Sequence, residues 1–278
     1  MKTKLRTFAL AGAAVLTVAG LARAEDAKVT GELDLPVLSA YVWRGQVVND
    51  KPVLEPSLTV SKNGFSLNTW ANFNLNNSYA SYAQDNKKEF SEVDLTASYA
   101  TTVGSTNSPI ALGGGFVQYL FPNQTLTSGT GSNAVSKAYP GTHEVYASIG
   151  LPSVFLAPTL QVNYDFDSAN GAYANFGISQ GFELVKDKAS LVASASIGAA
   201  TSKYNEYYFG TKKNAFNDAV VGLALPITLP GGWTIKPMLQ YVFLPDSTIR
   251  DDADTLYGHK DRFVGSLTAV YVFCPDPL

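Results

Sequence analysis

The sequence predicts an all-β protein, a closed antiparallel up-and-down transmembrane β-barrel of about twelve strands. Three observations support this fold class. Apolar and polar residues alternate with period two along most of the chain. Only 15% of the 278 residues are charged, whereas a typical soluble domain has about 25%. The segments that connect the alternating stretches are short and long in turn along the chain.

The first 24 residues have the organisation of a secretory signal peptide. Residues 2–6 carry three positive charges, residues 8–21 are apolar but too few to span a bilayer, and Ala22-Arg23-Ala24 is a small-x-small cleavage site. We expect cleavage near Ala24, which leaves one outer-membrane barrel domain over residues 25–278. An N-terminal anchor helix is the alternative for this stretch.

The charge and cysteine content exclude several classes of protein. Cleavage would remove four of the 20 basic residues and no acidic one, which leaves 16 against 23 and a net charge of −7. A negative chain is a poor partner for nucleic acid. The one cysteine excludes an intramolecular disulfide framework and a cysteine-rich metal site. We therefore predict no cofactor and no metal.

Residues 64–76 show the alternation most clearly. Phe65, Leu67 and Phe73 fall on one face, and Ser66 and Asn68 fall on the other. No segment shows a sustained helical period. The remaining predicted strands, in chain order, are residues 33–43, 54–60, 92–99, 109–121, 143–151, 156–166, 172–185, 189–201, 221–228, 233–243 and 263–273.

Long connections alternate with short turns along the chain. The long ones include residues 77–88, 122–142, 202–217 and 246–261, and every one falls on an odd-numbered junction. Transmembrane barrels have short periplasmic turns and long outer loops. The sorting therefore predicts both termini on the periplasmic side and all long loops outside.

The residue types on the two faces predict which face is inside. The polar face is rich in Asn, Ser, Thr and Gln rather than Lys and Glu, which suits a confined, hydrated lumen. The apolar face then contacts outer-membrane lipid, and closure satisfies every backbone group. Aromatic residues near the strand ends fit interfacial girdles, with simple packing as the alternative for each: Tyr41, Trp43, Phe65, Tyr99, Phe121, Trp233, Phe263 and Phe273.

Residues 39–100 carry a recognisable pattern, Tyr41-x-Trp43-Arg44-Gly45, then prolines, Trp70, and Glu92-x-Asp94-Leu95. This pattern resembles a family of uncharacterised exported Gram-negative proteins that are predicted to be outer-membrane β-barrels. The resemblance implies location in the outer membrane of a Gram-negative bacterium and insertion by the barrel-assembly machinery. It implies no activity. Outer-membrane barrels tend to end on an aromatic residue, whereas this chain continues past Phe273 to Leu278.

The predicted inward face carries most of the ionisable residues. Arg44 falls on the same face of the alternating pattern as Glu32 and Asp34. One hypothesis is an ion-pair network in which Arg44 bridges Glu92 and Asp94, and the other is a constricted pore whose acidic excess favours cations. Residues 122–142 are long enough to plug such a pore. The predicted lumen network comprises Glu32, Asp34, Arg44, Glu55, Glu92, Asp94, Glu144, Asp165 and Lys236, with Glu183 and Arg262 as further inward candidates.

These features predict a porin-like outer-membrane channel for small polar solutes, with a weak preference for cations. The alternative is a non-conducting structural or surface-binding barrel that acts through its outer loops. A barrel hydrolase is disfavoured because the only histidines are His143 and His259, in or beside predicted loops, and no Gly-x-Ser-x-Gly motif occurs. We therefore expect no enzymatic activity.

Overall fold

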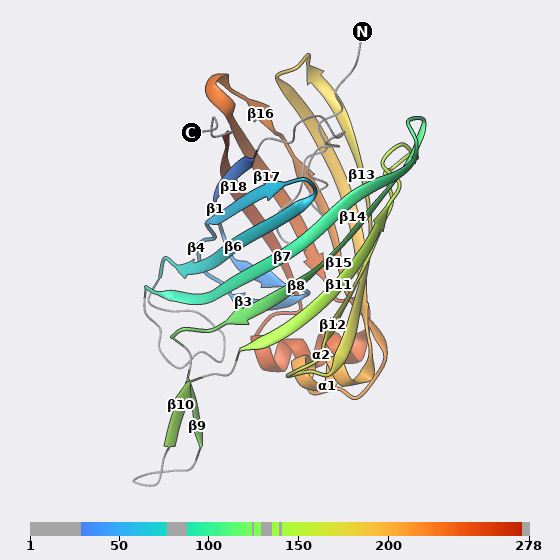
Figure 1. The fold of residues 1–278 in the computed structure, drawn as a ribbon. Coiled ribbons are helices and arrows are strands. Elements are labelled where there is room, and N and C mark those ends of the chain that lie inside the picture. Colours follow the sequence, from blue (N-terminus) through green and yellow to red (C-terminus); the bar gives the residue numbers. More distant parts are fainter. Residues whose placement is uncertain (1–28, 77–87, 124, 129–134, 139–140, 274–278) are drawn as a thin grey trace.

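One antiparallel sheet closes on itself to form the barrel (Figure 1). The computed structural model describes residues 29–76, 88–123, 125–128, 135–138 and 141–273, so the predicted signal peptide lies outside the described residues. The strands are β1 (Thr30–Leu38), β2 (Tyr41–Trp43), β3 (Gln46–Asn49), β4 (Val53–Leu54), β5 (Ser57–Lys62), β6 (Phe65–Asn74), β7 (Phe90–Ser105), β8 (Ser108–Leu120), β9 (Thr125–Ser128), β10 (Val135–Ala138), β11 (Thr142–Gly150), β12 (Thr159–Asp165), β13 (Gly171–Val185), β14 (Ala189–Ala200), β15 (Ala215–Ala224), β16 (Ile227–Thr228), β17 (Trp233–Phe243) and β18 (Asp261–Phe273). The helices are α1 (Ser202–Phe209) and α2 (Ser247–Tyr257), with a 3-10 turn η2 (Pro230–Gly232).

The wall of the barrel has twelve positions, as predicted. Strands β4 and β5 share the position between β1 and β6, and β15 and β16 share the one between β14 and β17. Pairing of β1 with β18 closes the ring, and every pairing is antiparallel. The predicted fold class is confirmed.

Side chains pack in the opposite sense to those of a soluble domain. Apolar residues face outward and stay exposed, for example Leu67 at 68% and Leu239 at 54%. Polar and charged residues are buried inside, for example Asn72 at 0% and Glu144 at 1%. A band of exposed apolar side chains this extensive is stable in contact with lipid rather than water. The predicted orientation of the two faces is therefore confirmed.

The two ends of the barrel differ, as the loop lengths predict. The short hairpin turns, such as those of β7–β8 and β13–β14, lie at one end of the barrel, together with the first residues of β1 and the last residues of β18. We call this the turn end. Helices α1 and α2 and the β9–β10 hairpin lie at the other, the loop end (Figure 1). Two short helices, α1 and α2, form within predicted loops 202–217 and 246–261, where the sequence shows no sustained helical period.

Local capping explains why α2 forms without a strong helical period. The Asp246 carboxylate accepts hydrogen bonds from the backbone N–H groups of Thr248 and Ile249, which satisfies two free donors at the helix start. Gly258 ends the helix with a φ of 71°, a left-handed conformation that glycine adopts without strain. Among the described helices none is long and apolar enough to span a membrane.

The first predicted strand is wrong beyond Leu38. Residues Leu38 and Val53 pair directly as neighbours in the wall, and the chain between them folds into the lumen as the β2–β3 hairpin. Tyr41 is 4% exposed and Val47 is 2% exposed. Tyr41 and Trp43 therefore line the interior instead of joining a lipid-facing girdle.

Other aromatic residues do form belts near the two ends of the wall. At the turn end Phe65 packs on Tyr99, with ring centroids 4.7 Å apart, and Trp233 stacks on its cross-strand neighbour. At the loop end Phe263 packs on Tyr241 at 4.6 Å. These rings are on the outer face, as predicted for Phe65, Tyr99, Trp233 and Phe263.

Glycines on β8 make room inside the wall. Tyr146 of β11 is paired with Gly115, and a Cβ on Gly115 would lie 2.7 Å from both the Tyr146 ring and the carbonyl oxygen of Ala97. The glycine therefore lets the tyrosine ring lie flat against the inner wall.

Candidate functional site

The tip of the β2–β3 hairpin is a two-residue turn with an unusual backbone. Arg44 has a φ of 46° and Gly45 a φ of 84°. Two positive φ values are typical of the tight turn that suits a twisted hairpin, but they strain a non-glycine residue. A Cβ on Gly45 would lie 2.6 Å from the Leu244 side chain, so a larger residue there would have to displace this buried leucine. The turn thus holds Arg44 in a fixed direction.

Arg44 makes a buried, two-pronged ion pair with Glu144 on the far wall. Its Nη1 and Nη2 atoms lie 2.7 Å from Glu144 Oε1 and Oε2, and the Tyr204 hydroxyl accepts a further bond from Nη1 at 3.1 Å. The guanidinium carbon lies 4.5 Å from the ring centroids of Trp43 and Tyr173. The predicted bridge from Arg44 to Glu92 and Asp94 is wrong, because the hairpin directs the side chain across the lumen to β11.

We call the groups around this guanidinium the Arg44 cage. It consists of Trp43, Tyr119, Glu144, Tyr173 and Tyr204. They come from the hairpin and from β8, β11, β13 and α1, so elements far apart in the chain build it together.

The cage is held in place by a second layer of hydrogen bonds. Tyr119 donates to Glu144 Oε2 at 3.0 Å, and Tyr173 donates to Asp218 Oδ1 at 2.9 Å. Burial raises the pKa of the Tyr204 hydroxyl, in spite of the nearby arginine, so this hydroxyl stays protonated. Both oxygens of the Glu144 carboxylate therefore accept hydrogen bonds, one from Arg44 alone and one from Arg44 and Tyr119.

Asp165 lies beside the cage, directly opposite Glu144 in the β11–β12 register. Thr142 donates to it at 2.9 Å, and the Tyr208 hydroxyl of α1 lies 3.4 Å away. The Tyr257 hydroxyl of α2 donates to Gln46 Oε1 at 2.7 Å. Both loop-end helices therefore hold the hairpin in the lumen.

Three carboxylates, Glu55, Glu92 and Asp94, lie together on the adjoining wall, and we call them the acidic cluster. Tyr41 donates to Glu92 Oε2 at 2.9 Å. Glu55 Oε1 and Asp94 Oδ1 are buried without a hydrogen-bond partner among the described residues. The cluster therefore contains buried acidic groups whose hydrogen-bonding capacity the neighbouring described residues leave partly unused.

The remaining predicted lumen residues form a separate group near the turn end. Glu32, Asp34 and Lys236 interact electrostatically with one another. The two acids are only half-buried, unlike the loop-end groups. The structure thus divides the predicted network in two. Glu183 is exposed beyond the lumen, and Arg262 donates to the Asp50 carbonyl oxygen at 2.6 Å instead of joining either group.

Inward side chains are more deeply buried at the loop end than at the turn end. Polar inward residues such as Asn68, Ser98 and Ser194 are half-buried near the turn end, whereas the hairpin tip is almost fully enclosed. A crevice of about 40 Å³ lies between the hairpin, Tyr119 and α1. The predicted plug, residues 122–142, includes the β9–β10 hairpin, which projects away from the barrel (Figure 1). The β2–β3 hairpin is the obstruction instead.

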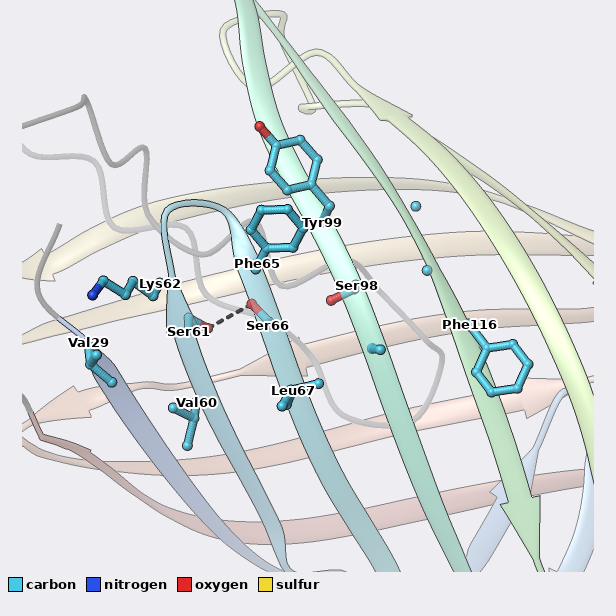
Figure 2. Close-up of a pocket in the computed structure, with 13 residues that line it drawn as sticks. Val29, Val60, Ser61, Lys62, Phe65, Ser66, Leu67, Ser98, Tyr99 and Phe116 are labelled. Carbon is cyan, nitrogen blue, oxygen red and sulfur yellow. Dashed lines mark hydrogen bonds between the residues drawn. The ribbon is translucent and has the colours of Figure 1, made fainter.

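A larger hollow of about 550 Å³ lies on the barrel wall near the turn end (Figure 2). Exposed apolar residues, including Phe65, Leu67 and Phe116, line most of it. Figure 2 also shows the Ser61–Ser66 hydrogen bond of 2.7 Å at the β5–β6 hairpin. Its lining is that of a lipid-facing wall and offers few groups for chemistry.

Both histidines lie near acidic side chains outside the Arg44 cage. His143 pairs with Asp167 at 3.0 Å and stacks between Phe116 and Phe166 on the outer face, while His259 lies 3.6 Å from Asp50. Within the described ranges no three His, Cys, Asp or Glu side chains are arranged to hold a metal ion.

Sequence reasoning missed four residues of the site, Tyr119, Tyr173, Tyr204 and Asp218. Tyr119 and Tyr173 lie at inward positions of predicted strands, so their parity could have indicated them. Tyr204 falls in a predicted loop and carried no such signal.

Comparisons with known proteins give similarities of fold at low sequence identity. No family model and no curated protein matches the chain. Among solved structures, the NanC porin is 12% identical with a TM-score of 0.45, and 88% of this chain aligns with 100% of that one. An outer-membrane channel from Pseudomonas putida F1 is 9% identical, with a TM-score of 0.48 over 90% of this chain and 97% of that chain. LpxR from Salmonella typhimurium is 10% identical, with a TM-score of 0.44 over 87% of this chain and 100% of that chain. The fold assignment rests on the strand pairing and the packing described above.

Proposed function

We propose that this protein is a porin-like outer-membrane channel for small polar solutes, with the β2–β3 hairpin as its constriction. The observation that carries the proposal is the position of the obstruction. A twelve-strand wall encloses more space than side chains alone fill, and what closes it is a hairpin whose two ends meet at the Leu38–Val53 pair. Removal of the hairpin would leave the wall unbroken.

The charges of the lumen support a preference for cations. Carboxylates outnumber cations at both levels, with the acidic cluster and Glu144 near the hairpin and Glu32 and Asp34 near the turn end. Acidic rings lower the energy of cations in a narrow passage. Small cations and polar cationic solutes are therefore the favoured cargo.

The setting of the channel belongs to the same proposal. A signal peptide ending near Ala24, the lipid-facing outer surface and the sorted loops together support export and insertion into the outer membrane of a Gram-negative bacterium. Insertion would use the barrel-assembly machinery, and outer-membrane lipid would contact the wall.

A second function is favoured by one specific observation. Arg44 is 7% exposed and Gln46 is 1% exposed, and both loop-end helices bond to the hairpin or pack on it. A hairpin fixed this firmly would make the barrel a non-conducting structural or surface-binding protein that acts through its loop end.

Planar-bilayer conductance of the refolded protein separates the two functions. One variant replaces residues 42–48 by a short glycine linker, and a matched control shortens the β9–β10 hairpin, which lies outside the barrel. The channel proposal expects a clear increase in conductance for the first variant and wild-type behaviour for the second. A barrel that stays silent without its inner hairpin would reject the channel.

Ion selectivity is tested in the same experiment. Replacement of Glu92 by Gln and Asp94 by Asn in the hairpin-free barrel should move the reversal potential toward zero selectivity in a salt gradient, because the acidic cluster loses charge. An unchanged reversal potential would reject the filter role of these two residues.

A further inference from the structure

Four of the five residues of the Arg44 cage lie outside the hairpin, on wall strands and on α1. Glu144, Tyr119, Tyr173 and Tyr204 belong to β8, β11, β13 and α1, and only Trp43 comes from the hairpin itself. The carboxylate is positioned by Tyr119, and the Tyr173 ring is positioned by Asp218. The wall and α1 therefore hold the groups that contact the guanidinium, and two of these groups are positioned by hydrogen bonds that do not involve Arg44.

The geometry of this cage selects a guanidinium group. Two parallel N–H donors meet the two Glu144 oxygens at equal distances of 2.7 Å, which a planar fork satisfies and a single ammonium does not. The flat cation also lies over aromatic rings at 4.5 Å. The Glu144 carboxylate would repel an anion, and a neutral amide would lack the positive charge that pairs with it.

The charge around the cage favours a cation when Arg44 is absent. Asp165 and Asp218 flank the cage, and the acidic cluster adjoins it. Of the buried side chains that the structure describes, the cations are Arg44 at the loop end and Lys236 toward the turn end. Without Arg44, Glu144 would be a buried carboxylate without a counter-ion.

Arg44 occupies this cage in a strained conformation and on a hairpin that is not part of the wall. Its φ of 46° is unfavourable for a side-chain-bearing residue. The hairpin that carries it is absent from the hydrogen-bonded ring of the wall. Both properties suit an occupant that another cation can replace.

We propose that the Arg44 cage is a binding site for small solutes that carry a guanidinium group, and that Arg44 is its tethered occupant. This inference rests on the proposed function only for the route by which a solute reaches the site. It names the class of cargo that competes with the hairpin.

The test is to remove the tethered group and supply it in solution. Arg44→Ala deletes the end of the side chain, and ethylguanidinium chloride at millimolar concentration replaces the deleted atoms. Binding is measured by calorimetry on the detergent-refolded full barrel, together with the shift in melting temperature. The matched control is Arg262→Ala, which removes an arginine that bonds to a backbone carbonyl oxygen.

The expected result is saturable binding and a raised melting temperature for Arg44→Ala alone. Wild type and Arg262→Ala should show neither effect. The double variant Arg44→Ala/Glu144→Gln should bind about tenfold more weakly or worse, because the charged fork is lost. Ethylammonium and ethylurea, which lack the fork and the charge respectively, should also bind more weakly by about that factor.

Absence of saturable binding to Arg44→Ala overturns the proposal, as does equal binding of ethylammonium or indifference to Glu144→Gln. If Arg44→Ala fails to refold, refolding is repeated with ethylguanidinium present. Recovery of the folded barrel only with that ligand supports the site, and no recovery overturns it. Binding is measured without conductance, so a silent channel and an empty cage are separate results.

Discussion

Neutralisation of Glu144 should be among the most damaging single changes to this barrel. Glu144 is 1% exposed and holds both prongs of Arg44 at 2.7 Å, so Glu144→Gln leaves a buried guanidinium without its counter-ion. Loss of one partner of a buried ion pair costs about 3–5 kcal/mol. This is a large part of the 5–15 kcal/mol by which a typical protein is stable. We expect the free energy of unfolding to fall by that amount.

The assay is urea unfolding of the refolded barrel in detergent, followed by tryptophan fluorescence. Trp43 lies over Arg44 and therefore also reports on the cage itself. The control is Glu183→Gln, an exposed carboxylate on β13, which should stay within about 0.5 kcal/mol of wild type. A second variant, Arg44→Met/Glu144→Gln, removes both charges and should recover part of the lost stability. If Glu144→Gln matches its control, or if the double variant is less stable than Glu144→Gln, the reasoning about the cage is refuted.

Three further predictions concern other parts of the molecule. Asp246→Ala should destabilise the loop end by about 1 kcal/mol through loss of the α2 cap. Burial alone would raise the pKa of Asp246. Hydrogen bonds from Lys213 and from the helix N–H groups outweigh burial and lower the pKa below its usual value. Because its folded pKa is depressed, this stabilisation is present above the unfolded pKa of about 3.9 and is lost as the pH falls through the folded pKa, and hydrogen exchange of α2 against pH checks it. Gly115→Ala should cost about 1–3 kcal/mol because its Cβ meets a carbonyl oxygen and a tyrosine ring, whereas Gly181→Ala, with nothing within 4 Å of its Cβ, should be near neutral in urea unfolding. Leu239→Arg, at the middle of β17 on the outer face, should cost about 2–4 kcal/mol in vesicles, and a cost no larger than that of Leu239→Ala would contradict a lipid-facing position.

Much of the wall could be predicted because its physics is local. Period-two alternation in residues such as 64–76 reports the two faces of a strand, and twelve such stretches match the twelve wall positions. The same periodicity caused the error after Leu38. The β2–β3 hairpin is also a two-faced strand pair, so the alternation runs through it, and only Arg44-Gly45 marked the turn.

The candidate site was predicted less completely because it depends on distant contacts. The inward carboxylates were identified by their alternation along the strands, which strand geometry fixes. Arg44 was assigned by the same alternation, but it lies at the tip of a hairpin beyond the end of β1. The choice of Glu144 as partner depends on a hairpin that reaches across the lumen, 100 residues along the chain. The α1 helix that supplies Tyr204 is only 8 residues long, too short for a periodic signal.

The most direct test of the account is the environment of consecutive residues on β6. Spin labels are placed one at a time at residues 65, 66, 67 and 68, on a Cys274→Ser background, in the barrel reconstituted into lipid vesicles. We predict that labels at 65 and 67 are relaxed by oxygen dissolved in the bilayer, while labels at 66 and 68 are relaxed by a water-soluble nickel chelate. The opposite assignment, or no alternation between odd and even positions, would contradict a barrel with lipid outside and a polar lumen within.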